Sequence, residues 1–373
     1  MTTKSEASTV DPSKAPNEPQ GREALNPIEL DGMKPEERKK KIIARVNQVF
    51  QLDPKYGPPG LGLGDAGAIL LKKIKSNKNM PIPASCEKTA WDVRSMVEEL
   101  VKHNSNDSEG KIVVDVWNYP IGNYNDIMKH YNPGKVKTDD QVAKEACESF
   151  KVEAAKQRET QLFKALIKTI EDKAGQNGMK RVKKIIAFGG GGIVSHPMKS
   201  VWVFQHAFVL ELQKIFAKSN SRQIPVIFQD PSYHAIDKLC APHLAEKSLG
   251  GAEVVEDTKD HKSWVALDQE TFYISLQTPS ELWRLVLEIT RPAAFLTDFP
   301  EIKESFFKAP NEKVYQIGET YYRIPGTGAP KYTWTEFQDD YDQIKIKGVT
   351  SNEKILGWPC LYIGRMPGEK KLE

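Results

Sequence analysis

Gly189, Gly190, Gly191 and Gly192 form a glycine loop directly after an apolar segment, residues 182–188, that is typical of a buried strand. Glycine can adopt positive φ and lets the backbone approach a flat or anionic ligand without an intervening Cβ. In a parallel α/β sheet, ligands bind beyond the carboxyl ends of the strands. We therefore place a candidate cofactor-binding site at this loop. The alternative is a tight strand-to-helix turn that serves packing alone.

The standard phosphate and cofactor motifs are incomplete around this loop. A Walker A sequence needs glycine directly before its Lys-Ser pair, whereas Met198 precedes Lys199. A dinucleotide fingerprint needs a third glycine where the chain has Val194 or Ser195. A class I methyltransferase usually carries an acid two residues before the first glycine, at the position of Ala187. The sequence therefore leaves the cofactor unidentified.

Two other side chains join the loop as candidates. Asp230 ends the second predicted strand, where nucleotide-binding α/β proteins often place an acid that bonds ribose hydroxyls. The alternative is a helix cap, because Asp before Pro231 can accept backbone N–H bonds. His196, beside the loop, is a weak candidate for a catalytic acid or base, since no nucleophile or carboxylate partner stands in a recognisable motif.

A metal site is not expected. His234, Asp237, Cys240 and His243 are close in the sequence, but helical zinc pairs use histidines four residues apart and no further ligand cluster accompanies them. A packing role for these side chains is the simpler interpretation.

Composition limits the classes of partner. The 53 basic and 50 acidic side chains leave a formal net charge of +3, which gives no strong signal for nucleic acid or a membrane surface. No apolar run approaches the roughly 18 residues of a membrane span. The four cysteines form no CxxC pair, which fits reduced thiols inside a cell. We expect a cytoplasmic or nuclear protein.

The elements that must position the loop alternate between strands and helices over residues 182–299. This alternation predicts an α/β protein with a Rossmann-like three-layer αβα core and a mainly parallel sheet. Four parts are expected: a disordered tail over 1–40, a mainly helical N-terminal region over 41–180, the core over 181–300, and a C-terminal extension over 301–373. The extension should pack on the core, begin with a hairpin at 313–324, and otherwise be irregular.

One long helix is predicted over residues 139–172. Its apolar stripe, which includes Leu162, Leu166 and Ile170, could dock a partner helix or pack on its own domain. The first possibility makes this helix a candidate protein-interaction surface.

Six segments in this order resemble the Sensitivity to Red-light Reduced (SRR-like) family: KKIIAFGGGGI, an apolar helix with Gln205, VIFQDPSYHAIDKL, LGGAEVVED, TFYISLQTPSELWRLVLE and AFLTDFP. The resemblance covers residues 183–299. Residues 276–278 and 297–298 depart from the Pro-His-Cys-like and Gly-Asn-Ser turns of the family. These departures and the long extensions resemble a divergent, fungal branch.

The resemblance implies a regulator rather than a defined reaction. The family is associated with circadian, light or stress signalling, and elsewhere with haem-biosynthesis control or cytoskeletal phenotypes. We favour an intracellular regulatory protein whose core binds a small nucleotide-like ligand or keeps only the scaffold. Two alternatives stay open: an enzyme that uses S-adenosylmethionine or a nucleotide, and a helical module that binds a protein partner.

Overall fold

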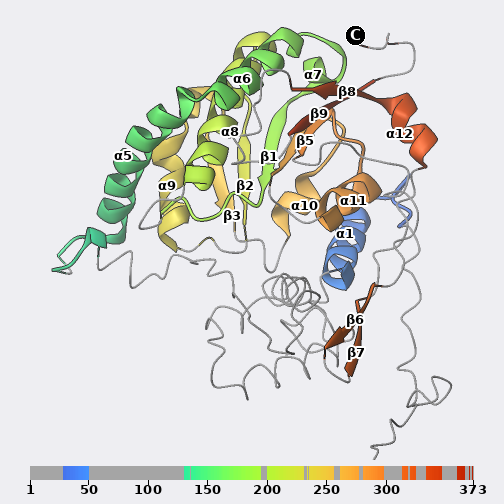
Figure 1. Ribbon diagram of the computed structural model, residues 1–373, viewed down its shortest axis with the longest axis horizontal. Helices are drawn as coiled ribbons and strands as arrows, with labels where there is room; N and C mark the ends of the chain where they lie inside the picture. The colour runs from blue at the N-terminus through green and yellow to red at the C-terminus, as the bar shows by residue number, and fades with distance from the viewer. Residues whose placement is uncertain are drawn as a thin grey trace, which may run out of the picture.

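The computed structural model describes residues 28–49, 130–134, 136–194, 200–230, 233, 235–255, 261–276, 280–297, 313–317, 320–324, 333–346, 359–365, 369 and 372 (Figure 1). Within the predicted N-terminal region, residues 50–129 lie outside this part of the chain. The candidate His196 lies outside it as well.

A seven-stranded sheet organises the protein, with strand order β3-β2-β1-β4-β5-β9-β8. Five neighbouring strands are parallel: β1 (Lys184–Phe188), β2 (Val226–Gln229), β3 (Ala252–Val255), β4 (Thr271–Ser275) and β5 (Ala294–Thr297). Two antiparallel strands extend it beyond β5: β9 (Cys360–Gly364) and β8 (Tyr341–Lys345). The predicted parallel α/β sheet is confirmed.

Helices cover both faces of the sheet (Figure 1). One layer consists of α5 (Asp139–Arg158), α6 (Gln161–Lys173), α8 (Ser200–Ser219) and α9 (Ala235–Leu244). The other consists of α1 (Pro35–Val49), α10 (Lys262–Ala266), α11 (Ser280–Ile289) and α12 (Trp334–Asp340). The short α7 (Asn177–Arg181) and the 3-10 helix η4 (Lys247–Leu249) precede β1 and β3.

The strands are apolar on both sides, as a sheet between two helical layers requires. Along β1, Ile185 and Ala187 pack with the layer of α5, α6, α8 and α9. Ile186 and Phe188, which alternate with them, pack with the layer of α1, α10 and α11. This division into two buried clusters is the three-layer αβα arrangement expected from the sequence.

The predicted single helix over 139–172 is wrong in one respect, because it consists of two helices. α5 ends at Arg158 and α6 begins at Gln161. Thr160 has an extended backbone, and its hydroxyl accepts a hydrogen bond from the N–H of Phe163 at 3.3 Å. This N-cap starts a new helix. The spacing of apolar residues does not reveal the break, because the buried residues of α5 and of α6 pack on the same face of the sheet.

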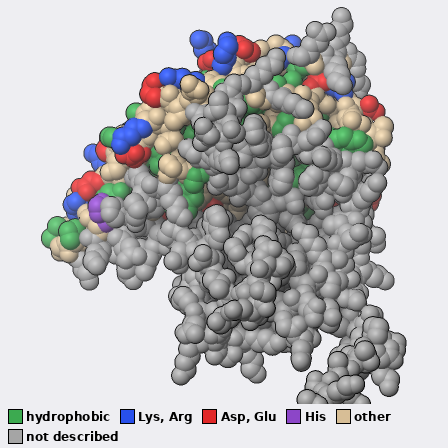
Figure 2. All heavy atoms as spheres, viewed as in Figure 1, with side chains coloured by type: hydrophobic (Ala, Val, Ile, Leu, Met, Phe, Trp, Pro, Cys, Tyr) green, Lys and Arg blue, Asp and Glu red, His purple; other side chains and the backbone are tan. Residues whose placement is uncertain are grey.

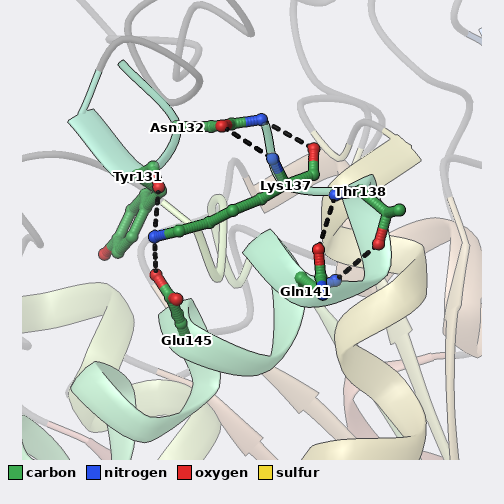
Figure 3. A network of polar contacts seen from close by, with 6 residues as sticks. All are labelled: Tyr131, Asn132, Lys137, Thr138, Gln141 and Glu145. Carbon is green, nitrogen blue, oxygen red and sulfur yellow. Dashed lines mark hydrogen bonds and ion pairs between the residues drawn. The ribbon is translucent and has the colours of Figure 1, made fainter. Parts of the chain in front are cut away.

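The start of α5 is fixed by side chains that bond the backbone (Figure 3). The amide of Asn132 donates to the carbonyl of Lys137 at 2.7 Å and accepts from its N–H at 3.0 Å. Thr138 and Gln141 form a reciprocal capping box. The Lys137 ammonium also contacts Glu145 at 2.6 Å. Local sequence therefore sets where this helix enters the fold.

Both ends of the chain contribute to the core. α1 begins at Pro35, before the expected end of the disordered tail at residue 40, and buries Ile42 and Val46. Most of the charged residues in its first turns are exposed. Arg45 of this helix forms an ion pair with Glu288 of α11 at 2.8 Å. Burial raises the pKa of Glu288, and Arg45 opposes that rise.

The C-terminal segment is more regular than expected. The predicted hairpin is confirmed as β6 (Lys313–Ile317) paired with β7 (Thr320–Ile324). The described residues that follow, which were expected to be irregular, include α12 and the strands β8 and β9. Because β9 pairs with β5 along Ala294–Thr297, this part of the C-terminal extension belongs to the sheet itself.

Candidate functional site

The glycine loop follows β1 at the carboxyl edge of the sheet. From β1, the chain passes through α8 to β2 on one side, and β4 lies on the other side. The sheet order therefore reverses between β1 and β4, which is where open α/β sheets bind ligands. The N–H of Gly189 bonds the carbonyl of Gln229 at 2.9 Å, so the loop stays attached to β2.

Close packing explains two of the glycines. A Cβ on Gly190 would lie 2.8 Å from the Tyr233 hydroxyl and 3.0 Å from His206 Cε1. A Cβ on Gly191 would overlap the indole ring of Trp202, and this residue has φ of +68°. The loop needs glycine because the first turns of α8 press against it, with or without a ligand.

Two buried carboxylates hold the loop. Asp230 Oδ2 accepts the N–H of Gly191 at 2.7 Å. Asp237 Oδ1, from α9, accepts the N–H of Val194 at 2.8 Å. Both side chains are buried. Two N–H groups that could have faced an anion are thus bonded to carboxylates, which also repel negative charge.

His206 is a neutral, fully engaged side chain behind the loop. Its Nδ1 lies 2.7 Å from the carbonyl of Trp202 and its Nε2 lies 2.8 Å from the hydroxyl of Tyr233. A carbonyl only accepts, so the proton sits on Nδ1, and Nε2 accepts from Tyr233. Burial lowers the pKa of His206 to about 4, although the Trp202 carbonyl opposes this shift. At neutral pH this histidine positions Tyr233 rather than transferring protons.

A small cavity lies beneath the loop, between β1, β2, β4 and α8. Its volume is about 10 Å³, which is space for a single water-sized group. The residues that line it are mostly apolar: Ala187, Phe188, Gly190, Gln205, His206, Val209, Phe228, Ile274 and Leu276. Gln205 and His206 supply the polar side chains.

The side-chain oxygen of Gln205 has no hydrogen-bond donor among the described residues. Its amide nitrogen donates to the carbonyl of Leu276, at the end of β4, at 3.0 Å. Since only the nitrogen can donate, this bond fixes which end of the amide is which. The buried oxygen Oε1 then receives no hydrogen bond from the described residues. An unpaired buried acceptor destabilises a protein by roughly 1–3 kcal/mol, so a ligand that donates a hydrogen bond to Oε1 would gain binding energy.

The structure brings the sequence-predicted candidates together in part. The glycine loop and Asp230 are in direct contact, which agrees with a shared site and equally with a supporting role for Asp230. Asp237 and Tyr233 were not predicted as neighbours of the loop. Gln205 was singled out only through the family resemblance. A glutamine within the otherwise apolar run VWVFQHAFVL was the available signal.

The described part of the chain offers little evidence for a second functional site of another kind. There, no group of three or more His, Cys, Asp or Glu is placed to hold a metal ion, and no helix is long and apolar enough to cross a membrane. Cys147, Cys240 and Cys360 are buried and form no disulfide. On the face in Figure 2, basic and acidic side chains intermingle over α5 and α6.

Comparison with known proteins identifies a family. The family model described as the SRR1 domain matches residues 156–354, from the last turn of α5 to beyond β8. The match is wider than the 183–299 segment that carried the resemblance, while α1 and β9 lie outside it. No curated protein and no solved structure matches the chain significantly. Because the match spans just over half of the 373 residues, this protein belongs to the SRR-like family, defined by the SRR1 domain.

Proposed function

We propose that this protein is an intracellular regulatory protein, cytoplasmic or nuclear, whose Rossmann-like core binds a small nucleotide-like ligand beside the glycine loop. The regulatory role, in circadian or stress signalling, follows the associations of the family. The ligand supplies the signal, and the loop with Asp230 forms the rim of its site.

One observation carries this proposal. The cavity is lined by β1 and β4, between which the sheet order reverses, together with β2 and α8, and Gly190 of the loop forms part of its wall. Ligands of open α/β sheets occupy this position because strand ends, loops and helix N-termini converge there. Asp230 shapes the rim through its bond to Gly191.

The described residues favour binding over catalysis. His206 is neutral and uses both ring nitrogens, so it does not supply a free acid or base. A catalytic role for His196 in an enzyme that uses S-adenosylmethionine or a nucleotide stays a prediction. The helical-module alternative is weaker, because the stripe of α6 that includes Leu166 and Ile170 is buried in the protein's own core.

The test is a thermal-shift screen of the full chain against S-adenosylmethionine, NAD(P), ATP, GTP and haem. A ligand at a hundred times its Kd should stabilise the protein by about 2.7 kcal/mol. The Gly190→Ala variant, whose new Cβ crowds the cavity wall at Tyr233 and His206, should lose that shift.

Gly175→Ala is the matched control, because its Cβ would meet nothing within 4 Å. This variant should keep the full ligand-induced shift. The proposal fails if no compound in the screen raises the melting temperature, or if Gly190→Ala responds as the wild type does.

A further inference from the structure

We propose, building on the function above, that the cavity recognises the neutral amino group of a heteroaromatic ring, as in a nucleobase, through Gln205 Oε1, and that phosphate contributes little to binding. The ligand class is therefore a nucleoside-like molecule rather than one held by its phosphates.

The donor requirement comes from Gln205. Its side chain is only 5% exposed, and one hydrogen of its nitrogen is donated to the Leu276 carbonyl. The remaining oxygen can only accept. The other polar side chain of the cavity, His206, has both nitrogens bonded. A ligand that satisfies Gln205 Oε1 must therefore bring an N–H or O–H.

The ring requirement comes from the rest of the lining. Phe188, Phe228, Ile274, Leu276 and Val209 present apolar surface around the single acceptor. A volume of about 10 Å³ admits one small group, with the remainder of the ligand outside. An amino group on the edge of a flat ring meets both conditions, because its ring also packs well on apolar walls.

The case against phosphate comes from the loop. The N–H groups of Gly191 and Val194 donate to Asp230 and Asp237, and those carboxylates oppose a further anion. In the described part of the chain, no residue that lines the cavity is charged. A phosphate cradle needs free N–H groups or cations, as in P-loop proteins.

The experiment measures binding of matched nucleosides to the full-length protein by isothermal titration calorimetry. Adenosine is compared with purine riboside, and guanosine with inosine, because each second compound lacks only the amino group. At least one amino-bearing nucleoside should bind. The affinity of its matched compound should be lower by a factor of about ten or more. The matching 5′-monophosphate should bind within about threefold of its nucleoside.

Gln205→Met should abolish the difference within the binding pair. Gln213→Met is the matched control: Gln213 lies two turns further along α8, is equally buried, bonds backbone carbonyls, and does not line the cavity. It should retain the difference. The nucleoside pairs probe the same contact in the unaltered protein, so a misfolded Gln205 variant would not remove the test.

Three outcomes overturn the inference. If a nucleotide binds while its nucleoside does not, the phosphate is the recognised group, and the proposed function stands without this inference. If the compounds that lack the amino group bind as well as their matched nucleosides, Gln205 does not recognise that group. If none of the nucleosides, nucleotides or screened cofactors binds, the inference and the proposed function both fail.

Discussion

The two ends of the parallel strands differ in how their polar groups are satisfied. Near the amino ends, the side-chain amides of Gln213 and Asn220 donate to backbone carbonyls. Gln213 donates to the carbonyls of Ile224 and Gly251 at 2.7 and 2.8 Å, and Asn220 donates to that of Val182 at 3.0 Å. These bonds join α8 to the segments that lead into β1, β2 and β3.

At the carboxyl ends, the corresponding glutamine keeps an unpaired oxygen beside a cavity. Gln205 and Gln213 share a helix and a low exposure, but they differ in their contacts. The nitrogen of Gln213 donates to the carbonyls of Ile224 and Gly251, whereas that of Gln205 donates to one carbonyl and the fully buried Oε1 of Gln205 has no hydrogen-bond partner among the described residues. The glycine loop and Asp230 lie at this same end. Native structures satisfy nearly all buried polar groups, so an unpaired acceptor on a residue that lines a cavity supports the proposed binding at the carboxyl ends.

The largest effect should come from Gly191→Ala. Positive φ costs about 1–2 kcal/mol for alanine, and overlap with Trp202 adds about 1–3 kcal/mol, so the free energy of unfolding should fall by roughly 4 kcal/mol. Gly251→Ala, at the amino ends, has similar φ and open space, and should cost about 1 kcal/mol. Urea denaturation of both variants measures the difference. Equal losses would show that Trp202 does not constrain the loop.

Acid should weaken the carboxyl-end region through His206. Its pKa is lowered to about 4 in the folded state, against about 6.5 when unfolded, so only the unfolded state takes up this proton between those values. The contribution of neutral His206 to the free energy of unfolding is complete above pH 6.5. It is lost as pH falls towards 4, and the total loss is roughly 3 kcal/mol.

Urea midpoints between pH 7 and 4.5 should therefore fall more steeply for the wild type than for His206→Gln, which cannot titrate. Parallel curves would mean that His206 is not buried as a neutral ring.

The two glutamines should differ in stability as well as in binding. Gln213→Met removes the donor shared by two carbonyls and should cost about 2 kcal/mol. Gln205→Met loses one bond but also removes an unpaired acceptor, so we expect a cost of about 1 kcal/mol or less. Chemical denaturation without ligand tests this order, and the reverse order would contradict the contrast between the two ends.

The smallest effect should come from the half-exposed ion pair at the amino ends. Lys184 and Asp268 lie 2.6 Å apart with side chains 23% and 44% exposed, so solvent screens their attraction. Lys184→Met should reduce the free energy of unfolding by less than about 1 kcal/mol, and salt should shrink the difference from wild type. A loss above about 2 kcal/mol, insensitive to salt, would show that this pair is structural in its own right.

Prediction from sequence succeeded where the signal was local and repeated. The strands around residues 184–188 and 271–275 are short apolar runs, and their alternation with helices determines the parallel sheet. Prediction failed where a single residue changed the outcome. Thr160 divides an otherwise continuous helical pattern, and no periodicity of apolar residues reveals an N-cap inside it.

The candidate site could be located from the sequence only to the glycine loop and Asp230. That their contact is a bond between Asp230 and Gly191, 39 residues apart, depends on the pairing of β1 with β2. The cavity and the unpaired oxygen of Gln205 depend on β4 lying beside β1, because the Leu276 carbonyl takes the other end of the amide.

The sequence by itself therefore determined the five parallel strands, the hairpin, several of the helices, the glycine loop and the resemblance to a family. Only the tertiary structure decided which groups stay free. Whether a buried amide or N–H is satisfied depends on partners far away in the chain, such as Leu276 for Gln205 and Asp237 for Val194. Local patterns carry no information about such pairs, because they arise when the sheet assembles.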